Sequence, residues 1–290
     1  MATCKNCGKP LILNGGKCIY CSTPCGEKKG EMNKTVQPGL PPVRTFTVNG
    51  VSFNMILVEG GTMWLGEQKS DPRKPNYDLE AERDDIWQEK IDTFYIGETL
   101  VTQELAKTFC IYHPWHSFYE NKDHLIVKDE DNLPAICSFH FNESFISELM
   151  AQTGELFRLP SENEWEFAAR GGCKSKGYRF AGSNVLTDVG WYQSNSFFGY
   201  YTSKEGGVGC QFRVDGVKMK NPNELGLYDM SGLVPELCVS RYGGEFRLRG
   251  GRFDKMAPDC RVSAPSGPYS TYSMAGIRLA MTPKYERARQ

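Results

Sequence analysis

The sequence lacks the features that mark several common classes of protein. Its longest unbroken apolar runs, such as Met55–Val58, are far too short to span a bilayer, so no membrane segment is expected. No basic segment followed by an apolar run opens the chain, so no signal peptide is expected and a cytoplasmic location is predicted. Neither sign of charge dominates: 34 basic residues stand against 35 acidic ones. That balance disfavours broad binding to nucleic-acid phosphates, which needs a basic surface.

What the chain does contain is typical of a loop-rich globular protein. It has 290 residues, of which 12% are aromatic, with 30 glycines and 16 prolines. A disordered chain would be poorer in aromatic residues. The length fits one large domain, alone or with one small module.

Five of the 11 cysteines lie in the first 25 residues. Four of them form two Cys-x-x-Cys pairs, Cys4 with Cys7 and Cys18 with Cys21, separated by a segment with the turn sequence Asn-Gly-Gly at 14–16. Four thiolates so spaced can hold a structural zinc ion. Disulfides or redox pairs are the alternative, but so short a segment cannot bury a core without a metal. Residues 1–25 are therefore predicted to form a zinc-ribbon-like module, with Cys25 spare or an alternate ligand.

A closed four-sulfur zinc site leaves no open coordination position, so this module is expected to be structural or to bind a partner protein. Nucleic-acid binding by its few lysines is a weaker alternative. Residues 26–44, rich in charge, proline and glycine, are predicted to be a linker. Residues 284–290 are expected to be a C-terminal tail, and the six remaining cysteines are expected to be buried thiols.

Local signals predict both strands and helices in the large domain, 45–283. Alternating apolar residues around Asn49-Gly50 predict a β-hairpin. Thr102 is expected to cap a short helix that runs through residue 110. Residues 142–152 predict an amphipathic helix that ends at Gly154. Ser161 and Glu164 predict a capping box, and the helix after it is expected to end at 171. Beyond residue 173 the helical period disappears.

Several segments together resemble the formylglycine-generating-enzyme (sulfatase-modifying factor) family: 55–66, 95–102, 158–172, 221–232, 249–251 and 276–280. They occur in the family's order and cover roughly residues 45–283. The resemblance implies an α+β fold of the irregular, C-type-lectin-like kind, preceded here by the small zinc ribbon.

Active members of this family oxidise a substrate cysteine with Cu(I), held by two cysteines that follow the Arg-Gly-Gly segment. In this sequence Cys260 stands at the second position, but Lys255 stands at the first. Cu(I) prefers two soft thiolates, and a protonated lysine is no ligand, so copper and the oxidase activity are disfavoured. The alternative is a divergent formylglycine-generating-type or nonheme-iron oxidoreductase, in which Lys255 lowers the pKa of a reactive Cys260. The only close histidine pair, His113 and His116, has no carboxylate at ligand spacing beside it.

A second departure concerns calcium. After the Asp-Met-x-Gly segment the family usually reads Gly-Asn-Val-Trp-Glu-Trp, and its Asn and Glu help to hold a calcium ion. Here Leu233 replaces the Asn and offers no side-chain oxygen, so calcium is disfavoured although Glu236 remains. The usual family pattern is kept at Gly232, Val234, Glu236 and Cys238, whereas the residues between them differ from the family. This period of two predicts one face kept for the core and one face free to vary.

The segment 264–273 is rich in Tyr, Ser and Gly, the composition of adaptable binding loops. The pattern resembles the variable proteins of diversity-generating retroelements, which use this fold and randomise Asn-type codons near the C-terminus. Most residues that differ from the family fall within the set of amino acids that such codons encode, whereas Lys255, Met256 and Met274 do not. Ordinary drift in a degenerate family member is the alternative explanation.

The leading hypothesis is a non-catalytic, receptor-type protein that binds an unidentified protein or other macromolecule through its C-terminal surface. The predicted ligand-binding residues are Leu233, Pro235, Leu237, Ser240, Arg241, Tyr242, Phe253, Asp254, Ala264, Ser266, Tyr269, Thr271 and Tyr272. Exposed tyrosines among them are plausible anchors, since aromatic residues dominate binding hot spots.

Overall fold

The computed structural model describes residues 40–109, 131–136, 139–202, 206–242, 245–264, 267 and 275–283. It also describes the backbone of three short strands at 13–14, 17–18 and 125–127, and the backbone alone at 139–143.

A five-stranded antiparallel sheet connects the two ends of the large domain. Its strand order is β3 (Val43–Val48), β4 (Val51–Val58), β7 (Phe94–Gly97), β14 (Ala280–Met281) and β9 (Phe157–Arg158). β14 lies between β7 and β9, so residues near 280 pair with residues near 95 and 157. β3 begins slightly before position 45, where the large domain was expected to start.

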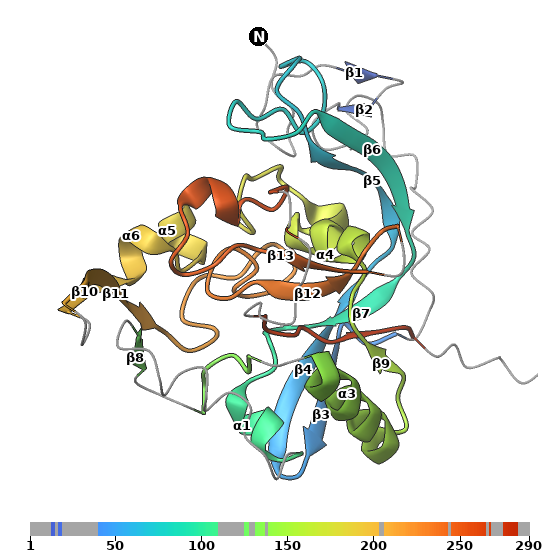
Figure 1. Cartoon of the computed structure of the whole chain (residues 1–290). Coiled ribbons are helices and arrows are strands. Elements are labelled where there is room, and N and C mark those ends of the chain that lie inside the picture. The colour runs from blue at the N-terminus through green and yellow to red at the C-terminus, as the bar shows by residue number, and fades with distance from the viewer. Residues whose placement is uncertain are drawn as a thin grey trace, which may run out of the picture.

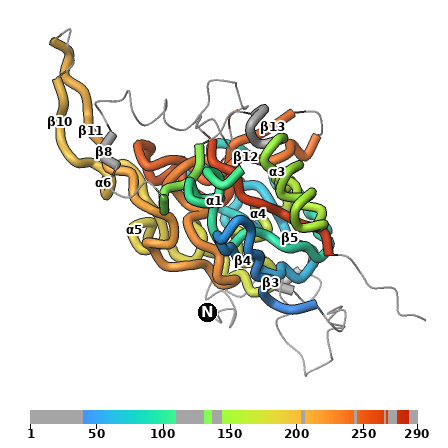
Figure 2. The backbone as a smooth tube through the Cα atoms, turned by 90° about the horizontal axis from the view of Figure 1, so that it is seen from below, coloured from blue at the N-terminus to red at the C-terminus, as the bar shows by residue number. Residues whose placement is uncertain are grey.

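Three smaller sheets surround this one (Figure 1). β5 (Gly61–Glu67) pairs with β6 (Asp85–Ile91), and β12 (Glu236–Val239) pairs with β13 (Phe246–Arg249), both antiparallel. The third has the order β10 (Phe197–Thr202), β11 (Val208–Val214) and β8 (Leu125–Val127). Figure 2 shows the β10–β11 hairpin extending away from the rest of the domain.

The predicted helix signals are confirmed, with changes in length. Thr102 caps α1 (Gln103–Lys107), and its hydroxyl accepts a hydrogen bond from the backbone N–H of Leu105. α3 spans Phe139–Thr153, so it begins before the expected residue 142, and Gly154 follows it with a positive φ. α3 lies alongside β3 and β9 (Figure 1).

α4 (Glu162–Ala169) has both halves of the predicted capping box. The Ser161 hydroxyl accepts from the N–H of Glu164, and the Glu164 carboxylate accepts from the N–H of Ser161. Such reciprocal bonds satisfy backbone donors that a helix start would otherwise leave free. Short helical turns follow at η1 (Gly172–Lys174), α5 (Leu186–Val189), α6 (Gln193–Ser196) and η2 (Ala257–Cys260). They lie around residue 173 or beyond it, where the sequence shows no helical period.

The Asn49-Gly50 hairpin is also confirmed. Val48 pairs with Val51, so Asn49 and Gly50 form the turn between β3 and β4. Both have positive φ, 50° and 86°, which Asn and Gly adopt at low cost.

The core has two main parts. In one, Tyr95 of β7 packs with Leu105 of α1 and with Phe145 and Leu149 of α3. In the other, Trp165 of α4 packs with residues of β5, β7 and β12. α4 thereby connects the β5–β6 and β12–β13 hairpins, and this arrangement positions the pocket described below.

The N-terminal prediction falls largely outside the described residues. Of the four expected zinc ligands, Cys4, Cys7 and Cys21 lie outside them, and Cys18 is described only as part of a strand backbone. β1 (Leu13–Asn14) and β2 (Lys17–Cys18) pair antiparallel, as expected for a hairpin between the two cysteine pairs. The zinc ion itself stays a prediction.

None of the helices in the described part of the chain has the length and apolar character to cross a bilayer. Likewise, no three His, Cys, Asp or Glu side chains among the described residues gather closely enough to hold a metal ion.

Candidate functional site

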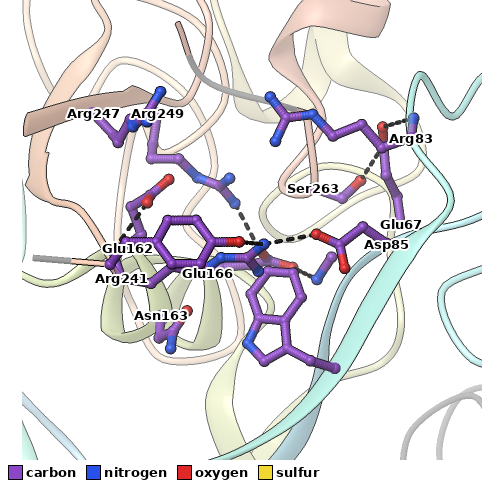
Figure 3. Close-up of a pocket in the computed structure, with 13 residues that line it drawn as sticks. Glu67, Arg83, Asp85, Glu162, Asn163, Glu166, Arg241, Arg247, Arg249 and Ser263 are labelled. Atoms are coloured by element: carbon purple, nitrogen blue, oxygen red, sulfur yellow. Dashed lines mark hydrogen bonds and ion pairs between the residues drawn. The ribbon is translucent and has the colours of Figure 1, made fainter. Parts of the chain in front are cut away.

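A pocket of about 270 Å³ opens between the β5–β6 hairpin, the start of α4 and the β12–β13 hairpin (Figure 3). β5 and β6 contribute Gly66, Glu67, Asp85 and Trp87, and the loop before β6 contributes Arg83. α4 contributes Glu162, Asn163 and Glu166. The β12–β13 hairpin supplies Arg241, Tyr242, Arg247 and Arg249, and Ser263 completes the wall.

β5 and β6 can pair closely at the pocket because residue 66 is a glycine. Gly66 has φ 78°, and a Cβ there would clash with the carbonyl group of Asp85 and with the Trp87 ring, both in β6. Its N–H donates to the Glu166 carboxylate at 2.8 Å. A larger residue would therefore displace Asp85 and Trp87, which line the pocket.

Glu166 forms the floor of the pocket and is fully engaged with cations. Its carboxylate pairs with Arg249 and with Arg170, each at 2.7 Å. Burial alone would raise the pKa of Glu166, but the two guanidinium groups outweigh burial and hold the pKa below its usual value. The floor therefore contains a charged carboxylate whose charge is compensated from two sides.

Glu67 forms a second compensated carboxylate in the wall. It pairs with the buried Arg261 at 3.0 Å and accepts a hydrogen bond from the Ser263 hydroxyl at 3.0 Å. Arg261 comes directly after Cys260, so this wall connects the pocket to the segment where the family's copper ligands are expected.

Arg241 lies against two aromatic rings at the mouth of the pocket. Its guanidinium carbon is 3.6 Å from the centre of the Trp87 ring and 4.8 Å from that of Tyr242. Its Nη2 donates to Asp85 at 2.6 Å and to the Tyr242 hydroxyl at 2.6 Å (Figure 3). Stacking and hydrogen bonding together hold the cation in one orientation.

Two of the predicted ligand-binding residues, Arg241 and Tyr242, line this pocket. Tyr242 is 77% exposed. The adjacent Ser240 is buried, and its N–H donates to the carbonyl of Glu245. Asp254 lies elsewhere, half-buried and paired with Arg252.

Other predicted ligand-binding residues are core residues, which corrects the expectation that they form a freely varying surface. Leu233 and Leu237 have no exposed area, Phe253 has 2%, and Pro235 and Ala264 are also buried. The alternation predicted for this segment is wrong, because residues 230–238 are buried on both faces. A strand in the middle of a packed domain is covered on both sides, so a period of two in the sequence does not imply one free face.

Leu233 has a backbone conformation that explains why the family usually has Asn at this position. Its φ is 61°, in the left-handed region that Asn and Gly tolerate better than Leu. The buried side chain packs with Trp191 and Phe253. Four further predicted residues, Ser266, Tyr269, Thr271 and Tyr272, lie outside the described residues.

Cys260 is buried at the end of η2, where it packs against Phe180, Leu186 and Val189. Burial raises the pKa of its thiol to about 12, so the thiol stays protonated at neutral pH. Lys255 is exposed, so its ammonium group is in water. This donor set does not fit a two-thiolate copper site.

The family's calcium position does not fit calcium either. Both carboxylate oxygens of Glu236 are engaged: Arg278 donates to them at 2.6 and 2.8 Å, and the Trp165 indole donates at 2.7 Å. Arg278 also donates to the carbonyls of Gly97, Glu98 and Tyr228. Glu236 and Arg278 have no exposed side-chain area, so the carboxylate belongs to a closed ion pair.

Much of the pocket lining is not predicted from the sequence. Trp87 and Asp85 lie outside the segments that resemble the family, and Glu166 lies in one of them, 158–172, without a predicted role at a site. The available signal was the spacing of Asp85 and Trp87, which places both on one face of β6. That spacing alone does not indicate which element the face meets.

Comparisons with known proteins agree with this architecture. Residues 44–283 match the family model for the sulfatase-modifying factor enzyme 1-like domain. The chain is 34% identical over 111 residues to a formylglycine-generating enzyme of Thermomonospora curvata, covering 38% of this chain and 34% of the relative. A formylglycine-generating enzyme of Streptomyces coelicolor is 32% identical over 101 residues, covering 35% and 32%. A protein of Paenibacillus barcinonensis described as chaperone protein LppX is 39% identical over 85 residues, covering 28% and 30%. The matched stretches thus span about a third of each curated relative.

Solved structures confirm the fold predicted for the large domain. Treponema denticola variable protein 1 superposes with a TM-score of 0.64 at 23% identity, over 84% of this chain and all of that one. PvdO from Pseudomonas aeruginosa superposes with a TM-score of 0.61 at 16% identity, again over 84% of this chain and all of that one. At such identities the likeness shows the fold.

Proposed function

The chain belongs to the sulfatase-modifying factor enzyme 1-like domain family, and we propose that it uses this scaffold to bind a macromolecular ligand rather than to oxidise a cysteine. One observation carries the proposal. Where the family's copper cysteines are expected, this chain has a buried, protonated Cys260 and an exposed Lys255. Two thiolates at one ion are what Cu(I) chemistry needs.

The ligand-binding half of the proposal is supported by the open pocket. Arg241 and Tyr242, both expected from the sequence to contact a ligand, lie at its mouth. Tyr, Trp and Arg are the residue types that most often dominate binding energy at interfaces. The buried residues among the predicted set belong to the core, so we propose that the ligand contacts come from the exposed ones.

The likeness to a variable protein supports a more specific version, in which a retroelement diversifies the C-terminal surface. The test is the encoding DNA. A near-copy of the 3′ end of the gene, differing only at adenines and accompanied by a reverse transcriptase gene, is expected nearby. Its absence would leave ordinary drift as the explanation of the altered residues.

A turnover assay tests the proposal that the chain does not oxidise a cysteine. The full chain is loaded with Cu(I) and incubated with a cysteine-containing peptide under oxygen, and the peptide is analysed by mass spectrometry. No formylglycine product is expected. Product that disappears in Cys260→Ala would overturn the proposal and favour the oxidoreductase alternative. Lys255→Cys is the matched gain-of-thiol variant, and it is expected to stay inactive because Cys260 is buried.

Binding is tested with a random-peptide phage library selected on the full chain. Selected peptides are expected to lose at least about tenfold in affinity with Tyr242→Ala, as for a hot-spot aromatic residue. The control is Arg73→Gln, which changes an arginine whose side chain is 78% exposed and outside the pocket lining. Unchanged binding by Tyr242→Ala across all selected peptides would show that the pocket is not the site.

For residues 1–25 we propose a structural zinc ion held by Cys4, Cys7, Cys18 and Cys21, in a module that contacts a partner protein in the cytoplasm. Elemental analysis of the purified chain is expected to find about one zinc ion per chain. Cys7→Ser with Cys21→Ser is expected to remove it. The control is Cys210→Ser in β11, which is expected to keep the zinc; Cys210 and Cys173 are exposed, which corrects the expectation that the later cysteines are all buried thiols. Zinc that survives the double substitution would contradict this ligand set.

A further inference from the structure

Three side chains of the pocket, Arg241, Arg249 and Trp87, have hydrogen-bond donors without an acceptor among the described residues, and we propose from this that the pocket binds the carboxylate of an acidic side chain on a protein partner. The inference rests on the proposed function, since it names the ligand chemistry of the same site. It is built from the state of three side chains, Arg241, Arg249 and Trp87, and from the charge around them.

Arg241 is held as a preorganised donor. Among the described residues, both of its side-chain hydrogen bonds leave from Nη2, to Asp85 and to the Tyr242 hydroxyl. Within the described part of the chain, its Nε–H and Nη1 groups have no acceptor. The nearby rings of Trp87 and Tyr242 limit the orientations of the guanidinium. An arginine that is already ordered loses little side-chain entropy on binding a ligand.

Two further donors are buried and have no partner in the part of the chain that the structure describes. The Arg249 side chain is 7% exposed and its Nε–H has no hydrogen bond, although its Nη atoms bind Glu166 and two backbone carbonyls. The indole N–H of Trp87 is likewise buried and unpaired. On the acceptor side, the Asn163 carbonyl oxygen is the unpaired buried atom of the lining. A buried donor without an acceptor is destabilising, so such groups mark places where an oxygen can be bound.

The balance of charge favours an anion with a single charge. The four arginines and four carboxylates of the lining cancel formally. Behind the wall, Arg170 and Arg261 pair with Glu166 and Glu67, while Glu245 pairs with Arg247 and Asp78 lies 3.7 Å from Arg261. Of the four arginines in the lining, Arg83 has no ion pair among the described residues, so its charge is available to an anion. Figure 3 places Arg83 and Arg249 on opposite sides of the pocket. Asp85 and Glu162 in the same lining would repel a doubly charged phosphate more than a carboxylate.

The test uses three small probes that differ only in the side chain: the N-acetyl, N-methylamide derivatives of glutamate, glutamine and arginine. Each is titrated into the full chain, and binding is followed by NMR at the arginine Nε–H signals. The glutamate probe is expected to bind at least about tenfold more tightly than the glutamine probe, the ratio expected for a charge-assisted hydrogen bond. It is also expected to shift the Arg241 signal.

Matched variants locate the effect. Arg241→Gln is expected to remove the preference for glutamate, and Trp87→Phe, which keeps a ring but lacks the indole N–H, to reduce it. Arg73→Gln is expected to change nothing. Equal binding of the glutamate and glutamine probes would overturn the inference, as would no binding of either. Tighter binding of the arginine probe would also overturn it, because the Trp87–Tyr242–Asp85 box would then be a cation site that Arg241 occupies.

The inference and the proposed function can fail separately. Phage peptides without acidic residues that still depend on Tyr242 would support the proposed function and overturn the carboxylate inference. In the opposite case, the glutamate probe binds as expected but the affinity of the selected peptides does not change in Tyr242→Ala. That result would overturn the proposed function and support the carboxylate site.

Discussion

Two clusters of the domain use the same chemistry, an arginine beside a tryptophan and a carboxylate, and differ in burial. In the core, Arg278 donates to Glu236 and to three backbone carbonyls, and the Trp165 indole donates to the same carboxylate. At the pocket, Arg241 stacks on Trp87 and donates to Asp85, but part of its guanidinium has no acceptor among the described residues. The first cluster is closed and holds the fold, whereas the second is open and has donors to offer to a ligand.

The largest expected effect is that of breaking the closed cluster. Arg278→Met leaves Glu236 as a buried, unpaired carboxylate, which costs about 3–5 kcal/mol of unfolding free energy. Urea unfolding of the full chain measures this. The double variant Arg278→Met with Glu236→Met removes both charges and is expected to recover much of the loss. A single-variant loss below about 1 kcal/mol would contradict the closed-cluster description.

A smaller effect is expected at Asp229, which lies beside the closed cluster. Burial raises the pKa of Asp229 to about 6, above its unfolded value of about 3.9. Between these values the native state holds a proton that the unfolded state has lost, so the contribution to stability falls as pH rises from about 4 to 6 and is constant above.

Asp229→Asn, which stays neutral, is therefore expected to raise the unfolding free energy by about 2–3 kcal/mol at pH 7 and to change it little at pH 4. Asn can still accept the hydrogen bond from the N–H of Lys218, and it tolerates the φ of 62° at this position. Urea unfolding at both pH values measures the difference. The control is Asp215→Asn, since Asp215 is paired with the partly exposed Arg213. A stability difference that does not change with pH would contradict the assignment.

The smallest effect on stability is expected at the open cluster. Arg241→Gln removes a stacked, partly exposed cation whose partner Asp85 is 51% exposed, and is expected to cost less than about 1 kcal/mol. The same urea experiment measures it. A loss as large as that of Arg278→Met would mean that Arg241 serves the fold, and the contrast between the two clusters would disappear.

The sequence predicted local structure where the signal lies within a few residues. The Asn49-Gly50 turn, the Thr102 cap and the Ser161–Glu164 capping box were all confirmed, because each depends on a short stretch of backbone. The family, and with it the fold, could be predicted because its motifs occur in order along most of the chain.

The site was predicted only in part. Arg241 and Tyr242 were identified, but Leu233, Leu237 and Phe253 were expected at the surface and are buried. The sequence around Leu233 carries a period of two, and whether the second face of such a segment is free depends on what packs against it. Trp87 and Asp85 were missed because nothing near them in sequence indicates that they meet a residue more than 150 positions later.

The sequence by itself determined the family, the turns and caps, and the replacement of a copper ligand by Lys255, since each depends on residue identity at known spacing. Only the tertiary structure decided which altered residues face solvent, that Cys260 is buried and protonated, and that Arg241 is stacked while Arg278 is enclosed. The physical reason is that burial, and with it the strength of a charge and the pKa of a group, depends on contacts between segments far apart in the chain.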